Sequence, residues 1–318
     1  MIDFGRSIFV CSKPLQFMIC STIARHFAIR DPLTFVVTNA FSDFTAFLAF
    51  ITRPGCGCAL ERVEQRANHH EVARELADLS YSSLFIEDDR VSNYHLYAPL
   101  KRRYLSVFEE GIGTYVTDYR DHMRGLRLLK WTALSIATGC GLDFGGGRTT
   151  DFVLVQFPEL YASLRPVNAH KAVGIPSVVG EMLRGRPEWD RLLCQELGVV
   201  DRMKRSALVL GTWGGVPPAA KGALASDVDA LFFKAHPHDE SAVDLPGARV
   251  VPLRWIPAEV IVHWLAQRSE TLLVYHFGST IEMNLWQHHR NVEFVDLGGA
   301  PEVPLLFDRL RGAASEGR

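Results

Sequence analysis

Residues 7–38 read SIFVCSKPLQFMICSTIARHFAIRDPLTFVVT, and this stretch decides the fold class. Its apolar run Ser7–Cys11 is typical of a buried strand, and Leu33–Thr38 is a second run of the same kind. The segment between them, Leu15–Phe27, has apolar residues at helical spacing. A strand, a helix and another strand in succession predict a parallel βαβ unit, so we expect an α/β fold.

The alternation of apolar runs and helical segments continues to residue 295. It predicts a mostly parallel, doubly wound sheet with helices on both faces in each half of the chain. We place the domain boundary in the polar stretch 187–206, which gives Rossmann-like domains over 1–200 and 201–318. Two such domains are expected to face a central cleft at the carboxyl ends of their strands. The further predicted elements are helices at 41–51, 62–79, 257–267 and 279–288, and strands at 83–86, 103–108, 151–155, 207–211, 230–234, 249–252, 271–275 and 292–295.

Length and composition limit the kinds of protein to consider. The chain has 318 residues, 47% of them hydrophobic and 22% charged, which suits two globular domains. Its formal net charge is -2, so no basic field indicates a nucleic acid partner. We find no secretory signal and no apolar run long enough to span a bilayer, and the six cysteines are scattered. We therefore expect a cytoplasmic protein with reduced thiols and no metal site.

Two short polar motifs come directly after predicted strands. In Glu109-Glu110-Gly111, a carboxylate at a strand end is suited to act as a general base. In His236-Pro237, a histidine at a strand end is suited to assist a departing phosphate. Taken alone, the first motif is more often an acidic turn, and the second is more often the end of a strand.

Other polar residues lie at helix starts or strand ends. Gly278-Ser279-Thr280 opens a predicted helix, where its hydroxyls either cap the helix or bind an anion. Glu259 is in the first turn of another helix, where it either suits the helix dipole or holds two ribose hydroxyls. Ser12–Gln16 either lines the cleft or simply starts the first helix. Lys234, at the end of a strand, adds positive charge to the histidine motif.

Together and in this order, the motifs resemble those of bacterial sialyltransferases of glycosyltransferase families 52 and 38, the lipooligosaccharide and capsular polysialic acid types. Those families have two acids followed by glycine, a His-Pro motif after an apolar strand, and two hydroxyl residues at a helix start. The corresponding residues here are Glu109-Glu110-Gly111, Lys234-Ala235-His236-Pro237 and Gly278-Ser279-Thr280, and Cys11–Gln16 is similar to the family's opening. The resemblance does not cover 118–201, and Glu110 and Thr280 stand where aspartate and serine are common.

The resemblance implies a GT-B fold and an inverting transfer of sialic acid, or a related nonulosonic acid, from a CMP-sugar to a hydroxyl of a glycan acceptor. It implies that Glu109 is the base toward the acceptor and that His236 assists the departure of CMP. It also implies that no metal is needed, because protein groups can neutralise the charge of the departing CMP, and that there is no cofactor, since the CMP-sugar is a substrate. The implied donor contacts are Lys234, Pro237, Ile256, Glu259, Ser279 and Thr280, and the implied acceptor or sugar contacts are Ser12, Gln16, Glu110 and Gly111.

Two other functions fit the same pattern. One is a GT-B transferase that uses a UDP- or GDP-sugar, and the other is a non-catalytic module that binds nucleotides or glycans. Residues 124–136 are basic and apolar, so they predict either a helix lying on an anionic membrane surface or a core helix with a basic edge. The pattern favours the core helix, and the other alternative would bring the chain to the inner face of the membrane. The sequence indicates neither the oligomeric state nor the acceptor.

Overall fold

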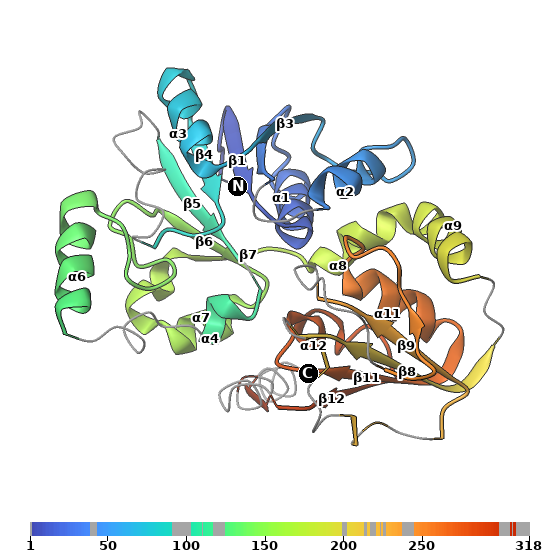
Figure 1. Cartoon of the computed structure of the whole chain (residues 1–318). Coiled ribbons are helices and arrows are strands. Elements are labelled where there is room, and N and C mark those ends of the chain that lie inside the picture. The colour runs from blue at the N-terminus through green and yellow to red at the C-terminus, as the bar shows by residue number, and fades with distance from the viewer. Residues whose placement is uncertain are drawn as a thin grey trace. The chain divides into compact units, whose positions relative to one another are not determined.

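The chain forms two compact units, coloured by sequence position in Figure 1. This computed structural model describes residues 2–38, 43–90, 103–109, 111–116, 125–198, 202–212, 215–216, 221–222, 224, 227–236, 245–298, 306 and 308–309. The first unit comprises Met1–Ala40, Cys58–Val178 and Ala313–Arg318, and the second comprises Phe41–Gly57 and Val179–Gly312. The predicted site residues Glu110 and Pro237, and Arg124 of the basic apolar segment, lie outside the described residues.

Among the described residues, the first unit is built on a sheet of seven parallel strands in the order β3-β2-β1-β4-β5-β6-β7. The order runs one way from β1 to β3 and the other way from β4 to β7, so the sheet is doubly wound. Right-handed connections then place helices on both of its faces. The strands are β1 (Ser7–Cys11), β2 (Leu33–Val37), β3 (Arg62–Arg66), β4 (Ser83–Ile86), β5 (Tyr104–Phe108), β6 (Phe152–Val155) and β7 (Ala172–Gly174). The helices are α1 (Pro14–His26), α3 (His69–Asp78), α4 (Gly113–Val116), α6 (Leu126–Thr138), α7 (Pro158–Leu164) and the 3-10 helix η2 (Pro166–Lys171).

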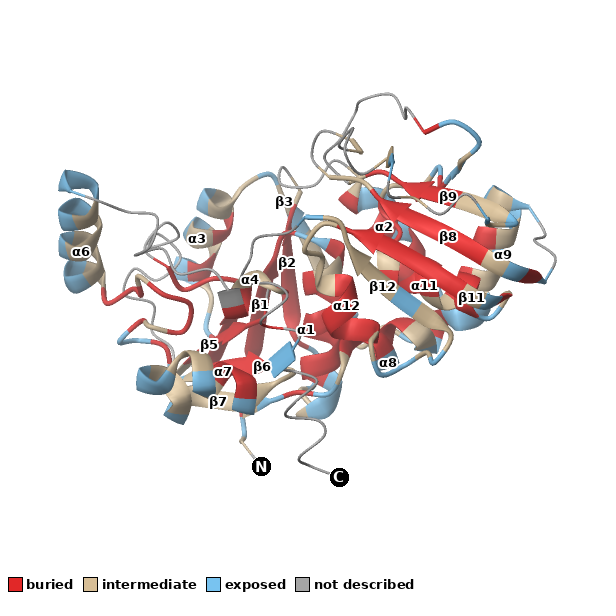
Figure 2. Ribbon diagram, turned by 90° about the horizontal axis from the view of Figure 1, so that it is seen from below, coloured by how far each residue is buried: buried red, intermediate tan, exposed pale blue. Residues whose placement is uncertain are grey.

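Apolar side chains on the central strands make the core of the first unit. Every residue of β1 and of β2 is buried. Phe4 packs edge-on against Phe85 and Phe152, with ring centroids 4.9 and 5.7 Å apart. Figure 2 shows the central strands in the buried colour and exposed residues on the surrounding helices. Burial of both sheet faces explains why these strands are near-continuous apolar runs in the sequence.

The described part of the second unit holds a smaller sheet of five parallel strands, in the order β10-β9-β8-β11-β12. This sheet is doubly wound as well, because the order changes direction between β8 and β11. The strands are β8 (Met203–Leu210), β9 (Ala230–Lys234), β10 (Arg249–Val250), β11 (Ser269–His276) and β12 (Val292–Asp296). The helices are α2 (Phe44–Ile51), α8 (Val178–Met182), the 3-10 helix η3 (Leu183–Gly185), α9 (Arg186–Leu197), α11 (Ala258–Ala266) and α12 (Thr280–Leu285).

The boundary between the units differs from the predicted one. The sequence predicts a single boundary after residue 200, whereas the chain enters the second unit after Val178, and 41–57 belongs to that unit. Aromatic packing explains the difference. The ring of Phe50 in α2 lies 4.3 Å from Trp189 in α9 and 5.4 Å from Trp255, between centroids. These contacts join α2 and α9 to the second unit.

The predicted helix over 62–79 is wrong in its first part. Residues Arg62–Arg66 form β3, which pairs in parallel with β2 at the edge of the sheet. Helix α3 begins only after Asn68, whose side chain accepts a hydrogen bond from the backbone N–H of Glu71. An exposed edge strand has no apolar run, so the charged residues around Val63 hide it in the sequence.

The loop before β6 is fixed by a buried carboxylate. Asp89 Oδ1 accepts from the backbone N–H of Gly145 at 2.8 Å, and Oδ2 accepts from that of Gly147 at 3.0 Å. The hydroxyl of Thr150 donates to Oδ2 at 2.6 Å. Asp89 is 1% exposed, and both of its carboxylate oxygens accept hydrogen bonds from this loop. We therefore assign it a structural role in holding the loop to the sheet.

Replacing Gly145 by Ala should destabilise the protein strongly. A Cβ atom there would collide with the hydroxyl of Tyr161 and lie 2.6 Å from Cγ2 of Val153, and Gly145 has a φ of +76°. We expect a loss of roughly 2–4 kcal/mol in the free energy of unfolding, measured by urea denaturation. The matched control is Gly180→Ala in α8, where a Cβ meets nothing within 4 Å. Equal stability of the two variants would contradict this packing.

Candidate functional site

Doubly wound sheets bind ligands at the carboxyl ends of their strands, where the strand order changes direction. In the first unit that point lies between β1 and β4, and in the second between β8 and β11. Ser12 and Glu87 follow β1 and β4, Glu109 follows the neighbouring β5, and Ser279 comes shortly after β11. Of the predicted site residues, Ser12, Glu109 and Ser279 therefore lie at the carboxyl ends of the strands, where this architecture binds ligands.

At the first of these points, Ser12 and Gln16 meet an acid that no motif indicated. The hydroxyl of Ser12 donates to both carboxylate oxygens of Glu87, at 2.9 and 2.8 Å. The backbone N–H of Ser12 is shared between Glu87 Oε2 at 2.9 Å and Gln16 Oε1 at 3.0 Å. His69 Nε2 lies 3.4 Å from Glu87 Oε1. Ser12 and Gln16 are almost fully buried, so in this structure their polar atoms form hydrogen bonds within the cluster and do not face solvent.

Glu109 lies at the end of β5 and is fully buried. Its Oε2 accepts from the hydroxyl of Tyr115 at 2.6 Å and from the backbone N–H of Gln156 at 2.8 Å. Its Oε1 accepts from Nε2 of Gln156 at 2.7 Å. Burial raises the pKa of the Glu109 carboxyl, and these three hydrogen bonds oppose the rise. Gly111, with a φ of +112°, turns the chain so that Tyr115 on α4 returns to Glu109.

Strand β9 ends at Lys234, and the half-buried His236 follows two residues later. The ammonium of Lys234 is buried and donates to the backbone oxygen of Arg254 at 2.9 Å. Burial lowers the pKa of Lys234 to about 8, while the nearby carboxylate of Glu259 opposes the shift. Lys234 is therefore mostly protonated at neutral pH and places a positive charge inside this end of the sheet.

Glu259 lies in the first turn of α11 and is also nearly buried. Its Oε1 accepts from Nδ2 of Asn284 in α12 at 2.9 Å. Burial raises the pKa of Glu259, and Asn284 and Lys234 act against that rise. Ile256 is 1% exposed as a whole residue, and its backbone N–H donates to the backbone oxygen of Leu253 at 3.4 Å.

The turn between β11 and α12 is held by a buried histidine. The hydroxyl of Ser279 caps α12, and its backbone N–H donates to Nδ1 of His276 at 3.2 Å. Because Nδ1 accepts, the ring proton is on Nε2, which donates to Glu282 Oε2 at 3.0 Å. Asp296 at the end of β12 accepts from the main chain of the same turn. These contacts fix the position from which Ser279 and Thr280, both half-buried, present their hydroxyls.

Sequence reasoning identified the acids and hydroxyls but missed the residues that hold them. A usable signal existed for Glu87, because it follows a predicted strand as Glu109 does. Gln156 and Asn284 reach their partners only through the tertiary fold, whereas Tyr115 and His276 lie six and three residues from theirs. The missed residues are Glu87, Tyr115, Gln156, His276 and Asn284.

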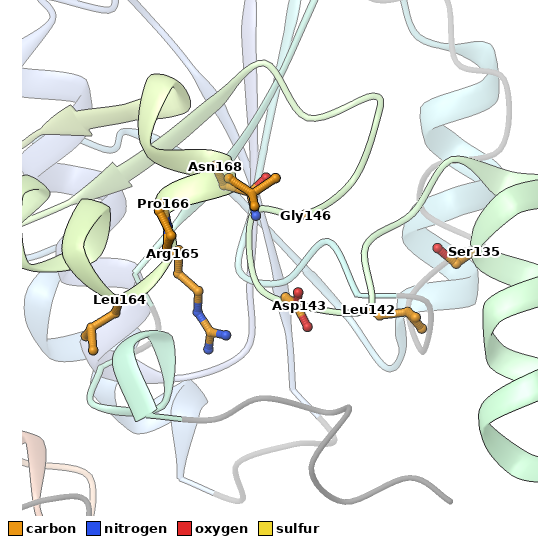
Figure 3. Close-up of a pocket in the computed structure, with 9 residues that line it drawn as sticks. Ser135, Leu142, Asp143, Gly146, Leu164, Arg165, Pro166 and Asn168 are labelled. Atoms are coloured by element: carbon orange, nitrogen blue, oxygen red, sulfur yellow. The ribbon is translucent and has the colours of Figure 1, made fainter. Parts of the chain in front are cut away.

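A pocket of about 370 Å³ lies elsewhere in the first unit. Figure 3 shows Ser135 of α6 on one side of it, and Asp143, Arg165 and Asn168 toward the other. None of the predicted site residues lines this pocket. Among the described residues, no group of three or more His, Cys, Asp or Glu side chains is placed to hold a metal ion. The carboxyl ends of the strands, which hold predicted site residues, are therefore a better candidate site than this pocket.

No protein-family model matches the chain, and no curated protein matches its sequence. Solved structures match it in fold. An α/β-galactoside α-2,3-sialyltransferase from Photobacterium phosphoreum matches with a TM-score of 0.54 and 10% identity, over 92% of this chain and 90% of that one. The fold is GT-B. The predicted α/β architecture with two Rossmann-like units is thereby confirmed.

Other proteins match with slightly lower scores. A variant of the wall teichoic acid polymerase TagF has a TM-score of 0.52 and 11% identity, over 89% of this chain and 68% of that one. A UDP-N-acetylglucosamine 2-epimerase from Rickettsia bellii has a TM-score of 0.50 and 12% identity, over 86% and 74%. At such identities the likeness shows the GT-B fold alone, so the reaction must be argued from the site.

Proposed function

We propose that the chain is an inverting, metal-independent glycosyltransferase. It moves sialic acid, or a related nonulosonic acid, from a CMP-sugar to a hydroxyl of a cell-surface glycan. One observation carries this proposal. Lys234 ends β9 and His236 follows it, the Ser279-Thr280 turn follows β11, and these two strands flank β8 where the strand order reverses. Doubly wound sheets bind the phosphates of nucleotides at this place.

In this proposal the second unit binds the phosphate of the donor. The hydroxyls of Ser279 and Thr280 hold it, on a turn that His276 keeps in place. His236 assists the departure of CMP, as an acid or by stabilising the developing negative charge. The protonated Lys234 adds positive potential at the same strand ends.

The nucleoside is assigned to the start of α11. Glu259 takes the ribose hydroxyls, and the main chain beside Ile256 and Pro237 faces the cytosine. Glu259 already accepts from Asn284 through one oxygen, so Asn284 orients the carboxylate while the other oxygen receives a hydroxyl. This division gives a nearly buried acid in the first turn of α11 a role in binding the donor.

The first unit activates the acceptor. Glu109 takes the proton of the acceptor hydroxyl as that oxygen bonds to the anomeric carbon of the donor. The bond from this carbon to the phosphate oxygen breaks, and CMP leaves with the electron pair, so the configuration inverts. Because Glu109 is buried and its Oε1 accepts a single hydrogen bond from the described residues, the acceptor hydroxyl is assigned to Oε1, and the neighbouring groups must move to admit it. The other acceptor-side residues are Ser12, Gln16, Glu110 and Gly111.

A donor panel tests this proposal. The native chain is incubated with CMP-sialic acid, UDP-galactose or GDP-mannose, with and without galactose-terminated oligosaccharides, and the released nucleotide is measured. We expect release of CMP from CMP-sialic acid alone, accelerated by the acceptor. Release of UDP or GDP instead would indicate a different GT-B transferase. No release from any donor would indicate a non-catalytic binding module.

A further inference from the structure

Helix α6 differs from the other long helices of the first unit, α1 and α3, because none of its residues is buried. Leu126, Leu129 and Ile136 are 84%, 67% and 65% exposed. Together with Val167 of η2, they make up four of the five large hydrophobic residues that are exposed in the described chain. Figure 2 shows α6 without buried colour along its length. The predicted core helix with a basic edge is therefore wrong.

The exposed apolar residues of α6 form one stripe. Leu126, Leu129, Ala133 and Ile136 are spaced at i, i+3, i+7 and i+10, so they share one face of the helix. All four are exposed. We call these four residues the α6 stripe. A face of this kind is unfavourable in water and indicates a binding surface.

The side of α6 that faces the unit is only half-buried. Its inner side carries Ser135, which borders the 370 Å³ pocket, and Figure 3 shows this residue across the pocket from Arg165 and Asn168. The hydroxyl of Ser135 donates to the backbone oxygen of Cys140 at 2.6 Å, a contact within the helix's own C-terminal turn. Leu128, Trp131 and Leu134 are half-buried, but burial within the unit does not explain the exposed apolar residues of the α6 stripe.

The charged residues of α6, and Arg148 beside its C-terminal end, are positive. Arg127 and Lys130 belong to the helix, which has no acidic residue, and Lys130 is about 40° around the helix axis from Leu126. The guanidinium of Arg148 donates to the backbone oxygen of Ile136 at 2.8 Å, at the C-terminal end of the helix. Arg127, Lys130 and Arg148 are exposed. Two copies of this surface would bring like charges together, whereas an anionic lipid surface complements them.

The length of α6 agrees with a position along a membrane surface. Its 13 residues extend about 20 Å, less than the roughly 30 Å of a bilayer core. Among the described residues, no helix is long and apolar enough to cross a membrane. We infer that the α6 stripe inserts into the interface of a bilayer containing anionic phospholipids, with Arg127 and Lys130 at the headgroups. This inference is independent of the transfer reaction.

Co-sedimentation of the full chain tests this inference. The vesicles consist of phosphatidylcholine alone, or of equal parts phosphatidylcholine and phosphatidylglycerol. We expect binding to the mixed vesicles that weakens as salt is added, and little binding to phosphatidylcholine. Removing both cations by Arg127→Gln and Lys130→Gln should lower binding on the order of tenfold or more. Absence of binding to the mixed vesicles would overturn the inference.

The stripe is tested by Leu129→Gln with Ile136→Gln, which should also lower vesicle binding on the order of tenfold. The matched control is Val250→Gln, which replaces an exposed hydrophobic residue of the second unit and should leave binding unchanged. Equal losses in the two variants would contradict a specific role for α6. The inference would also fail if the native chain were a dimer in solution that the stripe substitutions dissociate, because the stripe would then be an interface between copies.

Discussion

Replacing Glu109 by Gln is expected to lower the rate of transfer by about 100-fold or more while leaving the affinity for CMP unchanged. The substitution keeps the size of the side chain but removes the carboxylate that takes the acceptor's proton. CMP is assigned to the other unit, so its binding should not depend on Glu109. The rate of CMP release with acceptor and the affinity by calorimetry are measured on the same preparation. An unchanged rate, or full loss caused by Glu87→Gln instead, would contradict the role of Glu109.

Tyr115→Phe tests the same carboxylate without removing it. The hydroxyl of Tyr115 donates to Glu109 and lowers the pKa that burial raises. Its loss should raise the pKa of Glu109 further. A general base works when deprotonated, so the rate falls as the pH drops through this pKa. The acid side of the pH–rate profile should therefore move to higher pH in Tyr115→Phe, while an unmoved profile would indicate that Glu109 is structural only.

Replacing His236 by Asn should also reduce transfer by about 100-fold. The side chain loses its ability to donate a proton or carry a positive charge toward the departing phosphate. The effect should appear in the maximal rate more than in the affinity for CMP, because the charge develops as the bond breaks. The measurement is the maximal rate of CMP release at saturating donor.

The matched control for this substitution is His288→Asn, since His288 is an exposed histidine of the same unit. It should retain the native rate. If His236→Asn weakened CMP binding without lowering the maximal rate, His236 would be a binding residue only. If it changed neither, the second unit would need a different group to assist departure.

Much of the fold follows from local pattern. The apolar run Ser7–Cys11 and the strand 230–234 appear where the sequence predicts them, because buried parallel strands leave a clear signal. Strand Arg62–Arg66 left no such signal, since it lies at the sheet edge and is half solvated. The contact between Phe50 and Trp189 explains why the boundary between the units differs from the predicted one. A contact between segments so far apart in the sequence cannot be predicted from local pattern.

In the candidate site, too, some residues could be predicted from local sequence pattern and others could not. Glu109 and Ser279 were predicted because a strand end followed by a polar residue is visible in the sequence. Gln156 was not predicted, because only the order of strands in the sheet brings it to Glu109. His276 lies three residues before Ser279 but was not predicted, because no motif shows that its ring accepts from the backbone N–H of Ser279. The structure also shows that Glu109 is buried, which no motif implies.

The most direct test of the central claim is calorimetric titration of the native chain with CMP and with UMP. The two nucleotides share phosphate and ribose and differ at the edge of the base, so the comparison does not depend on knowing the acceptor. The proposed donor predicts that CMP binds about tenfold or more tightly than UMP, as expected for a site that hydrogen-bonds the cytosine amino group. Equal or tighter binding of UMP, or no binding of CMP, would contradict the account.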